Sequence, residues 1–444
     1  MDNVDKTKNT ENTQTQGATL NKITKILAIA LAFVVTFTAG YFSKYIFDNK
    51  KVTLVSEVVK IIENQGYIVD FKGVPKDVSE EEYADALVKT FLDDYSAYYT
   101  KEEYEDITNQ RNGDMSGFGI SMVNSTSASP TIISVEINSP AEIAGLKAGD
   151  IVVSVEKDGK TTAVDNGAEL AQMLTGEVGT QVTLRIKRDG EVLDTQFTIV
   201  KSIYKKCYVE YFDNEQWMNF RTNEKGKQVK NGGLHNTLDK TLADTYSQMD
   251  NETALIKLSK FEGDAAEQFQ TAIEYMEERG RTKLILDLRD NGGGYMDVLT
   301  KLAGSLIINN NKKTLIAYSK GKSSEQSFYM DKTHNNDFID YIVVLANGNT
   351  ASASECLIGA MLHYGENFSI DNLVVEGGRT YGKGIMQTTY ILSNGGALKL
   401  TTARIYQPDK TTCIHGTGIV PEPQNQTQNS SATITKALDI LYAL

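Results

Sequence analysis

Cysteine and histidine are both scarce in this chain of 444 residues. The three cysteines lie far apart and are odd in number, which argues against a disulfide framework. The four histidines show no metal-ligand spacing and add no zinc cluster to the cysteines. These residues are Cys207, Cys356 and Cys413, together with His235, His334, His363 and His415. We therefore expect no metal site, and so few cysteines are typical of an exported bacterial-type protein that does not rely on disulfides.

Positive charge is also in short supply. The chain has 45 Lys and Arg against 58 Asp and Glu, which gives a formal net charge of −13. Residues 1–51 are net positive, so the remaining residues are more acidic than the chain as a whole. An acidic body argues against nucleic acid as a partner. The length itself predicts two or three domains, each able to bury a sizeable core.

One long apolar run stands near the start of the chain. Residues 26–43, "ILAIALAFVVTFTAGYFS", are uncharged and lie between Lys25 and Lys44. At about 1.5 Å per residue they span roughly 27 Å as a helix, close to the thickness of a bilayer core. We expect residues 22–47 to be a single-pass transmembrane anchor at the cell membrane, with residues 1–21 as a cytoplasmic tail and the rest outside the cytoplasm. Lysines flank both sides, so the positive-inside rule supports this orientation only weakly.

A cleaved signal peptide is the alternative for this run, but the run is longer than a usual h-region and no clear A-x-A site follows it. After the anchor, residues 48–112 place apolar residues at helical intervals. The two segments are "VTLVSEVVKIIENQGYIVD" and "SEEEYADALVKTFLDDYSAYYTKEEYEDITNQ". We expect each to be helical and to form a spacer between the membrane and the body.

Residues 113–202 change to short β-type runs, the last of which predicts a hairpin turning at Asp189-Gly190. The runs "GFGISMV" and "SPAEIAGLKAGDIVVSV" resemble those of a PDZ domain. In such a domain the "GFGI" loop, here Gly117, Phe118, Gly119 and Ile120, receives the terminal carboxylate of a peptide. Backbone N–H groups freed by glycines make a nest for the carboxylate, and the adjacent strand edge accepts a peptide by β-augmentation. The alternative is that Gly117 and Gly119 only form a turn.

Residues 203–252 are rich in Lys, Asn and Gly and predict hairpins or an inserted loop. From residue 253 to residue 444, strand patterns alternate with helix patterns. This alternation predicts a mixed α/β body with a mainly parallel sheet flanked by helices. Catalytic groups in such sheets gather at the carboxyl ends of strands. Two predicted strand ends are unusual, "DLRDNGGG" and "ANGNTASASE".

The second of these strand ends contains Ser352, three residues before Glu355 and ahead of an apolar helix. This is the spacing of a capping box, so Ser352 is either a helix cap or a nucleophile on a tight strand-to-helix turn. A serine nucleophile needs a base. His363 lies eleven residues further along the helix, roughly 16 Å at about 1.5 Å per residue, and is too far away. Lys383 in "GGRTYGKGIMQ" could act as base only if burial kept it neutral, and alone it is more simply a solvated surface charge.

The motifs taken together resemble those of the C-terminal processing peptidases, also called tail-specific proteases. They are "FLDDYSAYYTKEEYEDI", "LILDLRDNGGG", "ANGNTASASE", "GGRTYGKGIMQ" and "LKLTTARIYQPDKTTCIHGTGIVPEP". Their order is kept over most of residues 75–425. The resemblance implies that Ser352 is the nucleophile, that Lys383 is the general base and that Gln387 helps to hold the lysine. If both lie on a strand, Lys383 and Gln387 are in phase and point the same way.

The resemblance also implies an oxyanion hole made of backbone N–H groups, from Ala353 and from a glycine of "NGGG", for which Gly293 is our choice. The whole chain then resembles a membrane-anchored serine endopeptidase that cleaves C-terminal or unfolded segments of proteins and needs no cofactor. One alternative is a non-catalytic PDZ scaffold on a degenerate protease body, favoured by the extra residues "ENFSIDN" before Lys383. Another is an α/β body that acts on a small acyl thioester. The oligomeric state is open, with a homo-oligomer as one alternative.

Overall fold

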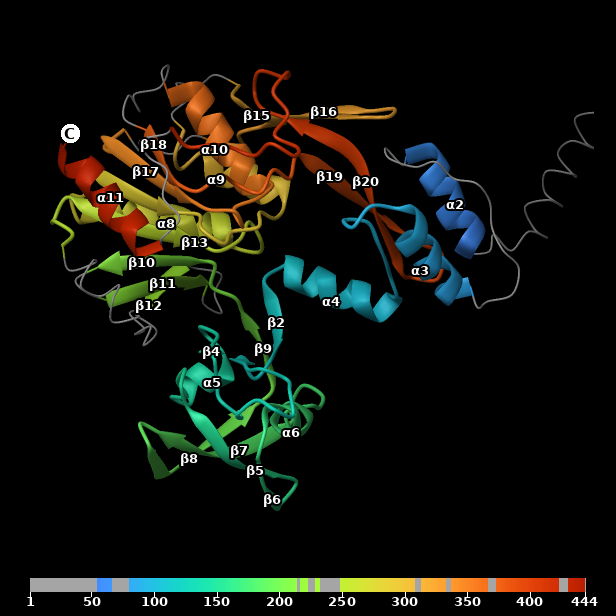
Figure 1. Cartoon of the computed structure of the whole chain (residues 1–444), viewed down its shortest axis with the longest axis vertical. Coiled ribbons are helices and arrows are strands. Elements are labelled where there is room, and N and C mark those ends of the chain that lie inside the picture. Colours follow the sequence, from blue (N-terminus) through green and yellow to red (C-terminus); the bar gives the residue numbers. More distant parts are fainter. Residues whose placement is uncertain are drawn as a thin grey trace, which may run out of the picture.

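The structure is a computed structural model that describes residues 54–65, 80–213, 216–222, 228–231, 248–307, 313–332, 337–365, 373–422 and 430–443. The expected transmembrane anchor at residues 22–47 lies outside these residues, and so does the tail at 1–21. None of the helices that are described has the length and apolar character needed to cross a membrane. Figure 1 shows a mixed α/β body, a long β-ribbon with two helices at its far end, and a β-rich domain below the body.

The body is built on a seven-stranded sheet of order β12-β11-β10-β13-β14-β17-β18. Four neighbouring strands pair in parallel, which confirms the predicted parallel sheet for this part of the chain. They are β13 (Thr253–Leu258), β14 (Lys283–Asp287), β17 (Tyr341–Ala346) and β18 (Leu373–Gly377).

Three antiparallel strands extend this sheet on one side: β10 (Val209–Asp213), β11 (Gln216–Thr222) and β12 (Gln228–Asn231). The prediction of hairpins in residues 203–252 is therefore confirmed where the chain is described. The alternative of an inserted loop does not hold for residues 209–213, because β10 pairs directly with β13 and its side chains alternate between the two faces of the body. Tyr211 faces one core and Phe212 the other.

Helices cover both faces of the seven-stranded sheet, as the sequence predicted. One face packs against α8 (Ala265–Glu278), α9 (Met296–Ala303) and α10 (Ala353–Tyr364) through residues such as Ile256 and Val344. The other packs against α11 (Ser430–Ala443) through Leu255 and Val343. Successive side chains of a strand point to opposite faces, so an almost continuously apolar strand supplies both cores.

A second, five-stranded antiparallel sheet carries the loops that face the strand ends of the first. Its strands are β1 (Ala97–Tyr99), β15 (Leu315–Gly321), β16 (Glu325–Tyr329), β19 (Ile385–Ile391) and β20 (Ala397–Tyr406). The predicted parallel arrangement does not extend to β15, which pairs antiparallel with β16 and β20. Helices α2 (Leu54–Gln65) and α3 (Glu80–Phe91) pack on the far end of the β19–β20 ribbon through Val58, Leu87 and Leu398.

The helical segment predicted at residues 79–110 is interrupted. Helix α3 ends at Phe91, a turn and strand β1 follow, and α4 (Lys101–Arg111) begins after Thr100. The Thr100 hydroxyl accepts a hydrogen bond from the Glu103 N–H, and the Glu103 carboxylate accepts one from the Thr100 N–H at 2.9 Å. This capping box starts a new helix and frees the turn before it to approach the body.

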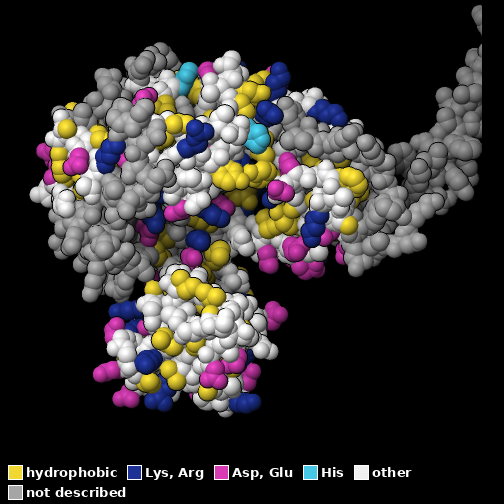
Figure 2. Space-filling model, in the orientation of Figure 1, with side chains coloured by type: hydrophobic (Ala, Val, Ile, Leu, Met, Phe, Trp, Pro, Cys, Tyr) yellow, Lys and Arg dark blue, Asp and Glu magenta, His cyan; other side chains and the backbone are white. Residues whose placement is uncertain are grey.

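The β-rich domain leaves and re-enters the body through β2 (Asp114–Gly117) and β9 (Ser202–Lys205), which pair with each other. Between them lie β3 (Ile120–Ser121), β4 (Ser134–Val135), β5 (Ile151–Lys157), β6 (Lys160–Ala163), β7 (Gln181–Arg188), β8 (Glu191–Val200), α5 (Pro140–Ile143) and α6 (Gly167–Met173). The predicted hairpin is present, because Asp189 and Gly190 connect β7 to β8, each with a positive φ. The domain has its own hydrophobic core. Figure 2 shows basic and acidic side chains interspersed over the visible face of this domain.

Candidate active site

The two unusual strand ends meet at the carboxyl edge of the parallel sheet. The loop after β14 and the loop after β17 are joined by a hydrogen bond from the Ala351 N–H to the Asn291 carbonyl at 3.0 Å. The Asp290 carboxylate accepts hydrogen bonds from the side chains of Asn347 and Asn349. These bonds, Asn349 first, lower the pKa of Asp290. Parallel strands bring their carboxyl ends together, and the two loops accordingly meet at this edge of the sheet.

Ser352 is the residue immediately before α10 and has φ 59° and ψ −115°. This backbone conformation is rare for a residue with a side chain and is costly unless the surroundings enforce it. A sharp, strained turn between strand and helix is also what exposes the nucleophilic serine in other hydrolase folds. The side chain is partly exposed. Ser352 is therefore accessible and stands at the N-cap of α10. We call residues 347–352 the nucleophile turn, after the role that the family resemblance implies for Ser352.

The other two hydroxyls of this stretch are fully buried. Thr350 Oγ1 donates to the Leu288 carbonyl at 2.8 Å and accepts from the Asn347 N–H at 3.0 Å. Ser354 Oγ donates to the Asn291 carbonyl at 3.0 Å. Both hydroxyls thus fix the loop, and Ser352 is the one that remains accessible.

Glu355 connects the nucleophile turn to the Lys383 loop. Its carboxylate is 0% exposed, and Oε2 accepts the N–H of Ser352 at 2.8 Å and the N–H of Lys383 at 2.9 Å. Oε1 accepts the Gly382 N–H at 2.7 Å and the Thr380 hydroxyl. Hydrogen bonds to a buried carboxylate are among the stronger ones in proteins. The capping-box spacing predicted the bond to Ser352, whereas the three bonds to the second loop could not be seen in the sequence.

Lys383 lies in the loop before β19 and is partly buried. Burial lowers the pKa of Lys383, the positive charge of Lys399 lowers it further, and Asp93 opposes the shift. The ammonium nitrogen lies 4.8 Å from the centre of the Tyr95 ring. No hydrogen bond joins Lys383 Nζ to Ser352 Oγ, although both residues belong to the described chain. The structure therefore brings the two loops together without pairing their side chains.

Gln387 lies in β19, next to an irregularity in its pairing with β20 between Met386 and Gln387. Its side-chain Nε2 donates to Thr401 Oγ1 at 3.0 Å. The argument that Lys383 and Gln387 alternate in phase along one strand was wrong, because β19 begins only at Ile385 and is irregular before Gln387.

The two predicted oxyanion donors lie beside each other. Gly293 has φ 94°, and a Cβ added there would lie 2.7 Å from the Ala351 carbonyl and 2.8 Å from the Ala353 nitrogen. The Ala353 N–H, at the start of α10, is one of the helix donors that have no acceptor within the helix. The Gly293 N–H donates to Asn291 Oδ1 at 2.9 Å. Gly293 thus supports the nucleophile turn by close contact, and its N–H already has an acceptor.

The residue that our reading of the sequence missed is Tyr95. It reaches Lys383 from the turn between α3 and β1, and its hydroxyl donates to the Tyr381 hydroxyl at 3.0 Å. Burial, and then the hydrogen bond with Tyr381, raise the pKa of Tyr95 to about 12. The signal was "FLDDYSAYYT", which carried part of the family resemblance but had no assigned role.

The predicted carboxylate loop of the β-rich domain follows β2. Gly119 has φ 79°, and a Cβ there would lie 2.0 Å from the Ser139 Cβ, so only glycine fits. The carbonyls of Phe118 and Gly119 accept hydrogen bonds from the N–H groups of Ala141 and Glu136. Phe118 is buried in the core of the domain, and Ile120 packs against that core. The carbonyls of this loop are thus turned towards residues 136–141.

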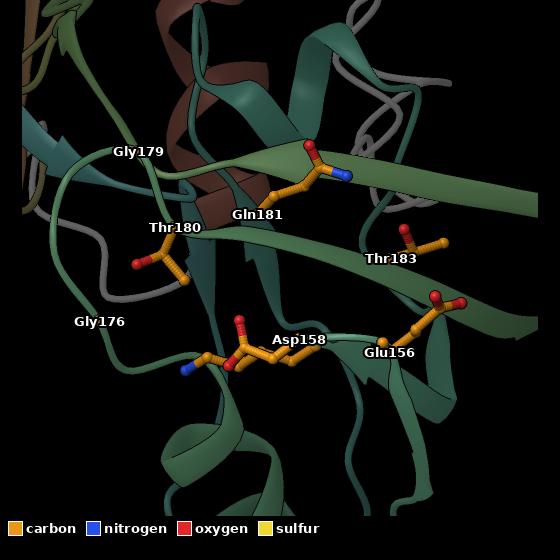
Figure 3. A pocket seen from close by; sticks show the side chains of 9 residues that line it. Glu156, Asp158, Gly176, Gly179, Thr180, Gln181 and Thr183 are labelled. Atoms are coloured by element: carbon orange, nitrogen blue, oxygen red, sulfur yellow. The ribbon is translucent and has the colours of Figure 1, made fainter.

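A hollow of about 620 Å³ lies elsewhere in the same domain, along the end of β5 and the turn after it, the loop before β7 and the start of β7. Figure 3 shows the side chains of Glu156, Asp158 and Thr180 around it. It contains none of the residues Gly117–Ile120 and is therefore a different place from the predicted peptide site. Among the residues with described positions, no group of three or more His, Cys, Asp or Glu side chains could hold a metal ion.

Comparison with known proteins agrees with the fold and the motifs. Residues 252–424 match the model of peptidase family S41, and residues 116–199 match that of the PDZ domain. A "Probable CtpA-like serine protease" of Staphylococcus aureus (strain N315) is 29% identical over 390 residues, covering 85% of this chain and 68% of the relative. A protein of the same description from Staphylococcus saprophyticus is 28% identical over 405 residues, covering 90% and 70%.

A solved structure from Bacteroides fragilis NCTC 9343 that was assigned to the S41 proteases has the same fold. It covers 87% of this chain and 97% of its own, with a TM-score of 0.53 and 15% sequence identity. These comparisons confirm the resemblance to C-terminal processing peptidases that the sequence motifs indicated. Residues 252–424 therefore form a serine peptidase domain of family S41, and residues 116–199 form a PDZ domain.

Proposed function

We propose that Ser352 and Lys383 form a Ser-Lys catalytic centre, and that this centre cleaves protein chains whose C-terminal or unfolded segments are bound by the PDZ domain. The observation that carries this proposal is the shared acceptor Glu355 Oε2, which binds the backbone N–H of both residues. Two loops that are separate in the sequence are thereby held next to each other. The lowered pKa of Lys383 is the second support, since a lysine is a base only when it is neutral.

In the proposed reaction, neutral Lys383 leaves the face of the Tyr95 ring and takes the proton of the Ser352 hydroxyl. The serine oxygen attacks the scissile carbonyl, and the proton passes from Lys383 to the leaving amine. Water then enters, gives a proton to Lys383 and attacks the acyl-enzyme, and Lys383 returns that proton to the Ser352 oxygen as the acyl group leaves. The N–H groups of Ala353 and Gly293 would hold the oxyanion, and for Gly293 this requires exchange of its present acceptor, Asn291 Oδ1. Gln387 would turn from Thr401 to support the lysine.

The PDZ domain supplies the substrate in this proposal. A chain terminus would bind with its carboxylate at the loop Gly117–Ile120 and its backbone along β3. The Phe118 and Gly119 carbonyls already accept the N–H groups of Ala141 and Glu136, which supports this use because free carbonyl oxygens would repel a carboxylate. Residues 22–47 would anchor the enzyme in the cell membrane with the peptidase outside the cytoplasm, which rests on the apolar run of the sequence alone.

A cleavage assay tests the proposal. Residues 52–444 are incubated with unstructured proteins that have apolar C-termini, alongside the variants Ser352→Ala and Lys383→Ala. We expect cleavage by the unaltered enzyme and none by either variant. Equal cleavage by Ser352→Ala, or no cleavage by any form even after residues 113–202 are deleted, would leave the chain as a PDZ scaffold.

A further inference from the structure

Tyr95 is held rigidly at the edge of the active site by a turn that is far away in the sequence. The Asp93 carboxylate accepts the Tyr95 N–H at 3.1 Å and the Ser96 hydroxyl at 2.8 Å. The Ser96 hydroxyl in turn accepts the Thr401 N–H of β20 at 3.1 Å. The turn is therefore hydrogen-bonded to β20, whose Thr401 also accepts the side chain of Gln387. This fixes the backbone position from which the Tyr95 ring extends.

The other end of the Tyr95 side chain is fixed as well. Its hydroxyl donates to the Tyr381 hydroxyl, and the Tyr381 N–H donates to the Thr350 carbonyl beside the nucleophile turn. Tyr381 itself is 56% exposed. The ring of Tyr95 is thus held between β20 and the nucleophile loop.

The face of this ring meets Lys383 Nζ at 4.8 Å from the ring centre, within the range of a cation–π contact. Such a contact stabilises the ammonium form only, because the attraction is between a positive charge and the negative ring face. The other charged groups that act on Lys383 are Lys399 on β20, which lowers its pKa, and Asp93 on the turn, which raises it. Glu355 binds the backbone of Lys383 but gives its side chain no hydrogen bond among those described.

We propose that Tyr95 is a positioning residue for Lys383, which holds the protonated amine on its ring face and releases it to Ser352 as the neutral base. The inference rests on the proposed function of Lys383. Tyr95 does not exchange protons in this role, because its raised pKa keeps it a neutral phenol at working pH. The ring raises the pKa of Lys383 and burial lowers it, so the two effects together set the pH at which neutral Lys383 becomes available as a base.

The test is a titration of Lys383 in the full-length protein carrying Ser352→Ala, by NMR of isotope-labelled lysine with Lys383→Arg to assign the signal. Tyr95→Leu keeps an apolar group and removes the ring face, so we expect the pKa of Lys383 to fall by about half a unit. Tyr95→Phe keeps the ring and should titrate as the parent does. With Ser352 restored, the acidic limb of the pH profile of kcat/KM should shift to lower pH by the same half unit in Tyr95→Leu. At a fixed pH on that limb, kcat/KM should then rise about threefold.

An unchanged or raised Lys383 pKa in a folded Tyr95→Leu variant would overturn the inference, as would a Tyr95→Phe variant that shifts like the leucine variant. If Tyr95→Leu does not fold, 3,4,5-trifluorophenylalanine at position 95 keeps the shape and weakens the negative ring face, with the same outcomes. The titration needs no cleavage, so it reports on Tyr95 even if the cleavage assay fails. Loss of the Ser-Lys proposal and loss of this one are therefore distinguishable.

Discussion

Ser352 occupies a backbone conformation that glycine adopts with far less strain than any other residue. The strain is maintained by contacts on both sides of the turn: the Gly293 loop packs against it, and Glu355 accepts its N–H. The sequence predicted a tight turn at Ser352 but not its backbone strain, because the φ angle of a single residue depends on which loop packs against it.

The strain at Ser352 predicts that Ser352→Gly is more stable than Ser352→Ala. A glycine at any helix N-cap is already better than alanine, so the matched control is Asn166, which caps α6 with φ −151°. We expect the glycine-to-alanine difference in free energy of unfolding to be about 1 kcal/mol larger at position 352 than at position 166. Urea unfolding of the four variants measures this, and equal differences at the two positions would show that Ser352 is unstrained.

Glu355 gives a second prediction at the scale of the residue. Glu355→Gln keeps the shape but replaces an acceptor oxygen with an NH2 group, which cannot accept from backbone N–H groups. We expect the free energy of unfolding to fall by about 2 kcal/mol and kcat to fall at least about tenfold, since both catalytic loops lose their common support. Thermal unfolding and a peptidase assay measure these changes.

The exposed Glu278→Gln on α8 is the control for Glu355→Gln and should change neither quantity. A Glu355→Gln variant with normal kcat would mean that the two loops are held together by other contacts.

Contacts between residues that are far apart in the chain could not be predicted from the sequence. Ser352 and Lys383 were identified through motifs that are local in sequence. Tyr95 and its partner Tyr381 are separated by 286 positions, and Glu355 and Lys383 by 28. Neither pair has a periodic spacing, so only the folded chain reveals them.

The loop after β14 acts as a single element that packs against the nucleophile turn. Gly293→Ala would place a methyl group 2.7–2.8 Å from Ala351 and Ala353 at a positive φ, whereas Gly292 has open space around it and no such φ. We expect Gly293→Ala to lose at least about 2 kcal/mol of stability and most of the activity, and Gly292→Ala to lose little of either.

Unfolding curves and cleavage rates of the two variants test this. Equal effects at the two glycines would mean that the loop tolerates displacement and that its contact with α10 is unimportant.

Element types were more predictable than element partners. The parallel strands β13, β14, β17 and β18 follow from buried apolar runs that alternate with helices. The antiparallel β15 has an equally apolar beginning, so its pattern does not reveal that it pairs with β20 in another sheet. The capping box at Thr100 was present in the sequence, and the structure shows that it starts a separate helix.

At the scale of the whole molecule, the PDZ domain has a core that shares no residue with the cores of the body. Asp150, buried at 0% exposure, pairs with Arg188 within the same domain at 2.6 Å. We therefore expect residues 114–205 alone to fold and to unfold cooperatively in urea.

Circular dichroism of the isolated fragment measures this. Asp150→Ala removes the carboxylate that pairs with Arg188 and should lower the urea midpoint, which serves as the control for native packing. A fragment without cooperative unfolding would show that the body is needed to complete the domain.

Both ends of the PDZ domain pass through the same two-stranded ribbon, β2 paired with β9. The entry and exit of the domain are therefore adjacent, and the polypeptide of the body is continuous on either side of one short junction. Any compact module whose own ends lie together could be exchanged at that junction. The selection of which proteins are delivered and the chemistry that cuts them are, by this layout, separable traits that can diversify independently.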